Sequence, residues 1–363
     1  MIDIDITLPR KHFDIVLREK FHRGITGIFG PSGSGKTSLL QVISGLSIPT
    51  SGRIAINRRK VFDTHCGLNV PTAKRNIGYV FQEGRLFPHM TVEKNLRYGI
   101  KKSNQRVDFD EVVQMLDLGR ILKSRPASIS GGEKQRTALG RTLLTSPDAL
   151  LLDEPFSALD TRLRDQILPF LLKVQQRFDV PVLVVSHDLP DLLKLTHSLC
   201  LLHEGRCIGH GAYHQLLKSS TSAAVLGQTP VLNVIDMQVE TEEGPDTGLV
   251  RLVFHREDGT VTVKCEKTEM FRFPGKTVRI FLNADDIALS AQKPAEMTIQ
   301  NQIEGTVVDV IDRGAKMLCI VDVGFRLLVE ITAASQAKMN IVPGRRMWCL
   351  FKAVAIQTCE TAV

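Results

Sequence analysis

Residues Gly30–Thr37 constrain this chain more than any other stretch, because they spell a loop that can hold phosphate. They read Gly-Pro-Ser-Gly-Ser-Gly-Lys-Thr and fit the pattern G-x-x-x-x-G-K-[ST]. Glycines let successive backbone N–H groups converge on phosphate oxygens, and the N-terminus of a following helix adds a favourable dipole. Lys36 can neutralise the β- and γ-phosphates, and the Thr37 hydroxyl can bind Mg²⁺. The predicted nucleotide ligands here are Gly30, Pro31, Ser32, Gly33, Ser34, Gly35, Lys36 and Thr37.

The residues on both sides of this loop support the same interpretation. Ile25–Phe29 read as a buried strand, and Ser38–Ile43 read as a helix that Gly45 closes. The alternative is a glycine-rich turn without a ligand, which would not require a strand before it and a helix after it. The sequence therefore predicts a nucleotide triphosphatase with an α/β core.

Composition bounds the remaining possibilities. The chain has 363 residues, of which 23% are charged and 43% hydrophobic, as in an ordinary soluble globular protein. This length predicts roughly two or three domains. The net charge is +7, but no run of Lys and Arg exceeds three residues. We therefore expect no nucleic-acid partner.

Cysteine usage and hydropathy suggest a cytosolic protein. The seven cysteines are scattered, and the spacing of Cys200 and Cys207 around His203 does not fit zinc, so we interpret them as reduced, mostly structural thiols. The N-terminus alternates apolar and acidic residues like a strand, not like a signal peptide. No apolar run approaches the ~18 residues of a membrane helix, so any membrane association should go through a partner.

Polar residues follow several predicted strands. Gln82 ends one strand, Asp153 and Glu154 end a second, and His187 follows a third. These strands are Asn76–Gln82, Ala149–Asp153 and Val182–Val185. An α/β sheet binds ligands at the carboxyl ends of its strands, where one carboxylate can hold the hydration shell of Mg²⁺ and a second can polarise water. A histidine at a strand tip is often only structural, but here it joins several polar groups at one sheet edge.

A helical subdomain interrupts the α/β pattern at about residues 83–145. Val112, Met115 and Leu116 have helical spacing, and Ser130–Arg136 open a longer helix with Ser130 as a natural N-cap. The two glycines after Ser130 could belong to a simple cap, or they could bind a second phosphate.

The ordered set of motifs resembles the nucleotide-binding domain of ABC transporters over about residues 1–228. The matching motifs are Gly30–Thr37, Gln82, Ser130–Glu133, Asp153-Glu154, Ser157–Asp160 and His187. The resemblance implies that Gln82 contacts the metal or water and transmits to the membrane subunit. It also implies that Asp153 orders Mg²⁺, that Glu154 is the catalytic base and that His187 holds the γ-phosphate.

The same resemblance implies a head-to-tail homodimer that sandwiches two ATP molecules. Ser130 and Gly132 would complete the site of the opposite subunit, and Gly131 and Asp160 count among the ATP ligands. The family's Leu-Ser-Gly-Gly-Gln reads Ile-Ser-Gly-Gly-Glu in this chain. Phe13 either stacks on adenine or packs in the core.

The C-terminal part changes to an all-β pattern. Past a hairpin at Leu199–Ile208, the polar stretch Lys218–Ser222 is a linker candidate. Residues 229–296 read as a linker and β region, and residues 297–363 as a small β-barrel of the OB-like kind. The predicted strands are Leu249–Lys264, a hairpin around Asp258-Gly259, and Val278–Leu282, Gly305–Ile311, Leu318–Val323, Leu327–Ile331 and Trp348–Ala355.

Residues 297–357 resemble the molybdate-binding Mop domain. The resemblance rests on Thr298–Asn301, Gly305–Val308 and Phe351–Ala353, and residues 79–99 and 129–144 resemble the ATPase subunits of molybdate importers. It implies molybdate as a possible ligand of the C-terminal domain, through Thr298, Asn301 and Lys352. Gln300 stands where the family motif often has arginine, which removes a charged donor to an oxyanion.

These resemblances imply an ATPase subunit of a bacterial importer, on the cytoplasmic face of the inner membrane. Its partners would be two integral membrane permease subunits and a periplasmic binding protein, and its cofactors ATP and Mg²⁺. Two alternatives stay open: an import ATPase for another substrate, such as tungstate, sulfate, iron or sugar, or a soluble ABC ATPase. The C-terminal region could be an oxyanion sensor or a dimerisation module.

Overall fold

A computed structural model of the chain contains two units, Met1–Val225 and Leu226–Val363. It describes all residues except 101–106, 158–163, 165, 166, 169, 170, 173, 176, 178, 228, 243–247, 257, 258, 268–274, 315 and 361–363. Each unit has its own hydrophobic core.

Five buried parallel strands form the centre of unit 1. In spatial order they are β10 (Ser198–His203), β3 (Gly24–Phe29), β9 (Pro181–Val185), β8 (Ala149–Asp153) and β7 (Ile77–Val80). Strands β8 and β9 are buried along their whole length, as expected for a parallel sheet covered on both faces. Because the strands are parallel, their carboxyl ends meet at one edge, where the predicted site residues follow them.

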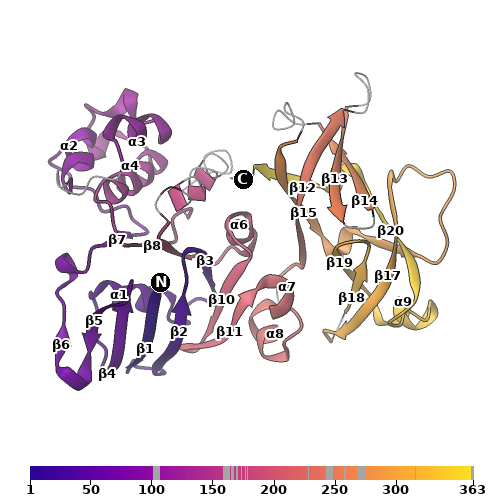
Figure 1. Cartoon of the computed structure of the whole chain (residues 1–363), viewed down its shortest axis with the longest axis horizontal. Coiled ribbons are helices and arrows are strands. Elements are labelled where there is room, and N and C mark those ends of the chain that lie inside the picture. The colour runs from indigo at the N-terminus through magenta and orange to yellow at the C-terminus, as the bar shows by residue number, and fades with distance from the viewer. Residues whose placement is uncertain are drawn as a thin grey trace. The chain divides into compact units, whose positions relative to one another are not determined.

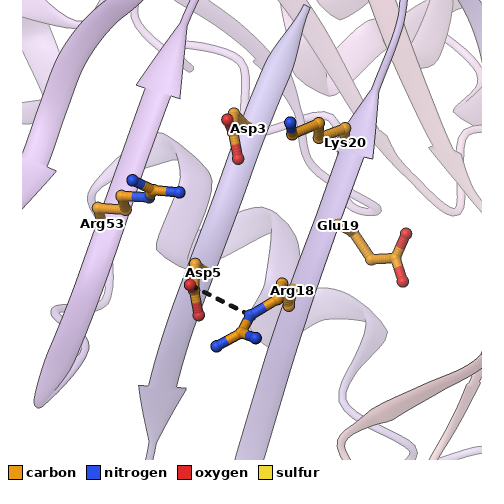
Figure 2. A pocket seen from close by; sticks show the side chains of 6 residues that line it. All are labelled: Asp3, Asp5, Arg18, Glu19, Lys20 and Arg53. Carbon is orange, nitrogen blue, oxygen red and sulfur yellow. Dashed lines mark ion pairs between the residues drawn. The ribbon is translucent and has the colours of Figure 1, made fainter.

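A mostly antiparallel part continues the same eleven-stranded sheet. Its strands are β1 (Ile2–Leu8), β2 (Ile15–Phe21), β4 (Ser51–Ile56), β5 (Arg59–Asp63), β6 (Leu68–Asn69) and β11 (Arg206–Ala212). Strands β1 and β2 pair as an antiparallel hairpin, and β1 is the strand that the alternation at the N-terminus predicted. Alternate residues of β1, among them Ile2, Ile4 and Ile6, enter the core, while Asp3 and Asp5 lie on the opposite face (Figure 2).

The helices of unit 1 fall into two groups. Helices α2 (Val92–Arg97), α3 (Phe109–Met115) and α4 (Gly131–Leu143) form the helical subdomain that the sequence predicted (Figure 1). The others are α1 (Lys36–Ser44), α6 (Leu189–Leu195), α7 (Tyr213–Leu216) and α8 (Ser220–Leu226). Short 3₁₀ turns lie at Thr64–Cys66, Thr72–Lys74, Gly119–Ile121, Pro126–Ser128, Ala284–Asp286 and Ala353–Ala355.

The prediction of a linker at Lys218–Ser222 is wrong. Helix α8 begins at Ser220, and Ser222 is fully buried. Its hydroxyl packs so close to Gly209 that a methyl group there would lie 2.8 Å from it. Small polar residues read as a linker in the sequence, but here their small size lets the helix pack against β11.

Unit 2 is built from two five-stranded antiparallel sheets, and the expected all-β class is confirmed. Their orders are β14-β13-β12-β15-β21 and β16-β20-β17-β18-β19. The strands are β12 (Leu232–Glu242), β13 (Leu249–Arg256), β14 (Gly259–Glu266), β15 (Thr277–Asn283), β16 (Ala288–Ser290), β17 (Asn301–Asp312), β18 (Met317–Asp322), β19 (Arg326–Ile331), β20 (Arg346–Phe351) and β21 (Gln357–Glu360), with one helix, α9 (Ala333–Lys338), among the described residues.

The two segments expected at 229–296 and 297–363 interleave in this unit. Strand β21 pairs with β15, and β16 pairs with β20, so each sheet takes strands from both segments. Both sheets also contribute to a single core, for example through Leu252 of β13 and Cys349 of β20. Asn233 joins them directly, since its carboxamide bonds Leu282 of one sheet and Leu328 of the other.

Candidate functional site

The loop Gly30–Gly35 lies between the end of β3 and the start of α1, as the phosphate-loop motif predicts. Gly33 and Gly35 have φ angles of +80° and +102°, which favour glycine. A side chain at Gly30 would place its Cβ 2.1 Å from the carbonyl oxygen of Leu202. The loop therefore depends on its glycines for both its turn and its support by β10.

Lys36 is buried against the phosphate loop. Its Nζ donates to the carbonyl oxygens of Gly30 and Pro31, both at 2.8 Å. Burial lowers the pKa of Lys36, and the nearby carboxylates of Glu154 and Asp153 oppose that shift. The ammonium group is thus held beside the backbone N–H groups of the loop, where a phosphate would need a cation.

Asp153, at the end of β8, is held from two sides. Thr37 Oγ1 donates to its Oδ1 at 3.1 Å, and Tyr79 Oη donates to its Oδ2 at 3.0 Å. Burial raises the pKa of Asp153, while the hydrogen bonds from Tyr79 and Thr37 oppose the rise. Burial, together with the charge of Asp153, also raises the pKa of Tyr79. The sequence alone does not indicate this role of Tyr79, because its contact depends on the pairing of β7 with β8.

One cavity gathers three of the predicted metal-site residues. It has a volume of about 340 Å³, and Thr37, Gln82 and Asp153 all line it. The other lining residues are Gln41, Leu46, Tyr79, Phe81, Glu83 and Arg85. A hydroxyl, a carboxamide and a carboxylate therefore converge beside the phosphate loop, and oxygen donors of this kind suit a hard divalent cation.

Glu154 and His187 contact each other at the ends of neighbouring strands. His187 Nδ1 lies 2.6 Å from Glu154 Oε2, and the backbone N–H of Glu154 donates to Val185 O at 3.0 Å. Glu154 has a φ of +49°, an unfavourable conformation for a residue with a side chain, and such conformations concentrate at functional sites. The Glu154 side chain is 17% exposed and that of His187 is 64% exposed, so this pair meets solvent on the histidine side.

Ser130 begins α4 in the helical subdomain and forms a capping box with Glu133. Its hydroxyl and its backbone N–H donate to Glu133 Oε2 at 2.9 and 2.8 Å, and Glu133 N donates to Ser130 Oγ. These hydrogen bonds, the backbone one first, lower the pKa of Glu133. Gly131 is exposed and Gly132 buried at the same helix start. Among the described residues that line the 340 Å³ cavity, Ser130, Gly131 and Gly132 do not occur.

Asp160 and Phe13 are the two remaining predicted ATP contacts. Asp160 lies outside the described residues. Phe13 is half-buried against the core of unit 1 and also packs over Gly205, at the turn between β10 and β11.

The three predicted oxyanion ligands of unit 2 differ in their surroundings. Thr298 and Lys352 are exposed, whereas Asn301 is 3% exposed. The Asn301 carboxamide accepts from Lys264 N at 2.7 Å and donates to Lys264 O at 2.9 Å. It therefore joins β17 to β14 and is already engaged in holding the two sheets together.

A second hollow, of about 550 Å³, lies over the β1–β2–β4 part of the sheet (Figure 2). Its lining residues are Asp3, Asp5, Arg18, Glu19, Lys20 and Arg53. Arg18 Nε and Asp5 Oδ2 form an exposed ion pair at 3.2 Å, which contributes little to stability. The charges are mixed in sign, and no residue is shared with the phosphate loop, so this hollow is separate from the nucleotide site.

The fold and the site define an ABC-type ATPase that binds ATP. The ABC transporter family model matches residues 19–157, and the TOBE domain model matches residues 298–357. A dimeric structure of the ATP-binding cassette MJ0796, in a post-hydrolysis state with ADP and Pi, is similar to this chain with a TM-score of 0.50. The two are 26% identical, and the match covers 58% of this chain and 98% of that one.

Relatives that match over the full length show to which family of ABC-type ATPases the chain belongs. The Molybdenum import ATP-binding protein ModC of Paramagnetospirillum magneticum is 35% identical over 367 residues, which cover 100% of this chain and 99% of the relative. The protein of the same name from Vibrio vulnificus is 36% identical over 371 residues, covering 100% and 95%. The chain belongs to this family of molybdenum import ATP-binding proteins. Among its described residues, no helix is long and apolar enough to cross a membrane.

Proposed function

We propose that this chain hydrolyses ATP to drive a bacterial molybdate importer. The contact between Glu154 and His187 beside the phosphate loop carries the hydrolytic part of the proposal. The full-length similarity to proteins named for molybdenum import supports molybdate as the transported ion. Two copies of the chain would sandwich two ATP molecules, work on two permease subunits at the cytoplasmic face of the inner membrane and receive molybdate through a periplasmic binding protein.

Thr37, Asp153 and Gln82 are the residues that would hold Mg²⁺. The fit rests on their oxygen donors, two of which are only 3.1 Å apart in one cavity. When bound, the ion would neutralise part of the phosphate charge. Tyr79 fixes the carboxylate of Asp153 from the side away from Thr37, so this ligand is oriented before the ion arrives.

Glu154 is the proposed base, and His187 is the proposed partner of the γ-phosphate. The Glu154 carboxylate can accept a proton from the attacking water. His187 presents Nδ1 to Glu154, which leaves its Nε2 for a phosphate oxygen. Lys36 and the loop backbone would hold the phosphates so that the water and the base remain aligned.

Ser130 and Gly132 are proposed to contact the ATP of the partner subunit, and Gly131 and Asp160 are also proposed as ATP ligands. Because the Ser130 hydroxyl donates to Glu133 in this structure, that bond would have to open before the hydroxyl could reach a phosphate. The backbone N–H groups at the start of α4 could bind phosphate without this change.

The segment Gln82–Met90 is the proposed dock for the permease. Phe81, Arg85 and Phe87 line a largely apolar hollow of about 620 Å³ on its surface, together with Tyr98, which is 62% exposed. Exposed apolar surface of this kind suits a protein partner. Arg85 and Arg141 lie over aromatic rings in the same region, at 4.3 Å from Phe81 and 5.2 Å from Phe87.

The role of unit 2 has two candidates, and the engaged carboxamide of Asn301 favours a structural or dimerisation role over an oxyanion sensor. Calorimetry of the full chain with molybdate, without nucleotide, separates them. Saturable binding of molybdate, with sulfate at least about tenfold weaker, would support the sensor, since about 1.4 kcal/mol separates such affinities. The absence of heat would leave unit 2 as a scaffold.

The decisive experiment for the catalytic proposal compares Glu154→Gln with the surface variant Glu93→Gln in a permease-bound complex. Glu154→Gln should keep ATP bound and lose turnover, because the carboxylate acts on water and not on the nucleotide. Turnover within a few-fold of wild type would show that Glu154 is not the base. Uptake of molybdate and of sulfate by the same complex tests the substrate separately, and preferential uptake of sulfate would reject molybdate.

A further inference from the structure

Two cysteine side chains meet across the β10–β11 hairpin. The Sγ atoms of Cys200 and Cys207 are 3.4 Å apart, with Cys200 fully buried and Cys207 half-buried. Cys207 lies opposite Leu202, and Cys200 lies opposite His210, with a register shift between them. Diagonal neighbours on paired strands are normally too far apart for such contact, but a bulge increases the local twist and brings them together.

We propose that Cys200 and Cys207 form a modification site, where hydrogen peroxide closes a reversible disulfide that weakens ATP hydrolysis. The functional half of this inference rests on the proposed ATPase activity, whereas the disulfide itself can be tested without it. The thiols are already close, so closure needs the sulfur atoms to approach from 3.4 Å to ~2.05 Å, without a rearrangement of the fold.

Glu19 and His210 form a hydrogen-bonded pair beside the half-buried thiol. His210 Nδ1 lies 2.7 Å from Glu19 Oε2, and Glu19 leaves β2 on the side away from Arg18 and Asp5 (Figure 2). Burial opposes ionisation of Glu19, but hydrogen bonds from His210 and from the Cys207 thiol together hold its pKa below the usual value. Glu19 is therefore a carboxylate at neutral pH and places a charged group beside the Cys207 thiol.

The chemistry balances with peroxide as the oxidant. The Cys207 thiolate, its proton released to solvent, attacks one oxygen of hydrogen peroxide, so the O–O bond breaks and a sulfenic acid and hydroxide form; the released proton and the hydroxide make water. The Cys200 sulfur then attacks the oxidised sulfur, the S–O bond breaks and water leaves as the disulfide forms. Both sulfurs are oxidised, peroxide is reduced to two waters, and a thiol reductant restores the two thiols.

The disulfide would act on the nucleotide site because the hairpin supports the phosphate loop. The turn residue Gly205 donates its N–H to Ser34 O at 3.0 Å. The carbonyl of Leu202 lies so close to Gly30 that not even a methyl group would fit between them. Leu202 and Gly205 both lie between the two cysteines in the chain, so drawing the strands together moves the surface on which the loop rests.

The test uses the full chain, treated with hydrogen peroxide and digested with trypsin under non-reducing conditions. Trypsin cleaves after Lys194, Arg206 and Lys218, so the two cysteines fall in different peptides. We expect these peptides to be linked in monomeric protein and to separate with dithiothreitol. ATP hydrolysis should fall by roughly tenfold or more and return on reduction, since a displacement of about 1 Å in a positioning group can cost about 100-fold.

Two variants control this experiment. Cys207→Ser should prevent the link and make the ATPase resistant to peroxide, whereas Cys66→Ser, at an exposed thiol, should behave like wild type. Absence of the linked peptides in wild type would overturn the modification site. Two results would overturn the proposed effect of the disulfide on ATP hydrolysis. One is a peptide link that leaves ATP hydrolysis unchanged, and the other is a peroxide-induced loss of activity in Cys207→Ser equal to that in wild type. A reduced protein without ATPase activity would instead count against the proposed function, because the peptide link is measured independently.

Discussion

Arg75 offers the sharpest test of how the phosphate loop is stabilised. It is only 1% exposed, and its guanidinium donates to the carbonyl oxygens of Val42 and Ile43 at 3.0 and 2.9 Å, in the last turn of α1. It also donates to Val70 O at 2.9 Å and to Asn69 Oδ1 at 3.0 Å. Helix α1 begins at Lys36, so its positive end faces the phosphate loop. The guanidinium of Arg75 therefore stabilises the opposite, negative end of the same helix.

Replacing Arg75 with methionine should be strongly destabilising. The Val42 carbonyl keeps a bond from Gly45 N, but those of Ile43 and Val70 lose the guanidinium donor. At about 1–3 kcal/mol for the buried Ile43 carbonyl and about 0.5–1.5 kcal/mol for the half-buried Val70 carbonyl, the two together predict a loss of roughly 1.5–4.5 kcal/mol in the free energy of unfolding of unit 1. Methionine fills much of the same volume, so little of this loss comes from a cavity.

Urea unfolding followed by far-ultraviolet circular dichroism measures this loss, because α1–α4 and α6–α8 belong almost entirely to unit 1. The matched control is Arg59→Met, which removes a single exposed hydrogen bond to Lys74 O and should change stability by less than about 0.5 kcal/mol. Trp348, the only tryptophan, lies in unit 2, so its fluorescence follows that unit separately. A loss below about 1 kcal/mol for Arg75→Met would refute the reasoning.

Three further predictions follow from buried or capping polar groups. Asn233→Ala leaves the backbone N–H and C=O of Leu328 without their carboxamide partner and should cost roughly 1–3 kcal/mol, measured by tryptophan fluorescence in urea. Asn95→Ala removes the side chain that bonds both the N–H and the C=O of Phe87, so permease-stimulated ATPase should fall while basal ATPase persists; equal loss of both would count against the dock. Glu133→Ala should reduce the free energy of unfolding by about 0.5–2 kcal/mol, which is measured as a lower melting temperature. Because the folded pKa of Glu133 is lowered, this contribution is present above the ordinary carboxyl pKa and should vanish as pH falls through the lowered value.

The parts of the site that could be predicted are those in which sequence neighbours determine the geometry. Gly30–Thr37 need only the strand before them and the helix after them, and the fold supplies both. Asp153, Glu154 and His187 each follow a buried apolar strand, and parallel strands bring their carboxyl ends to one edge. This is why Thr37 and Asp153 meet although 116 positions separate them.

The contacts that the sequence did not reveal depend on pairing between distant segments. Tyr79 reaches Asp153 only because β7 lies beside β8 in one particular register. Cys200 and Cys207 have a spacing that fits no familiar motif, and only the bulge in their hairpin joins them. Asn301 fits a ligand motif in the sequence, but the neighbouring sheet engages its carboxamide. Residue type and spacing do not determine strand register, so these contacts required the structure.

The pairing of β21 with β15 also affects how the chain folds during its synthesis. Unit 1 is complete once residue 225 has emerged from the ribosome, whereas the first sheet of unit 2 still needs the strand at Gln357–Glu360. At about 5–20 residues per second, roughly 7–27 s pass between these two points. The edge of β15 exists only after residue 283 has been made, and it then waits for the 77 residues up to Glu360, roughly 4–15 s. During that time it is available for pairing with another nascent chain, so we expect polysomes to be the place where this protein is most exposed to misassembly.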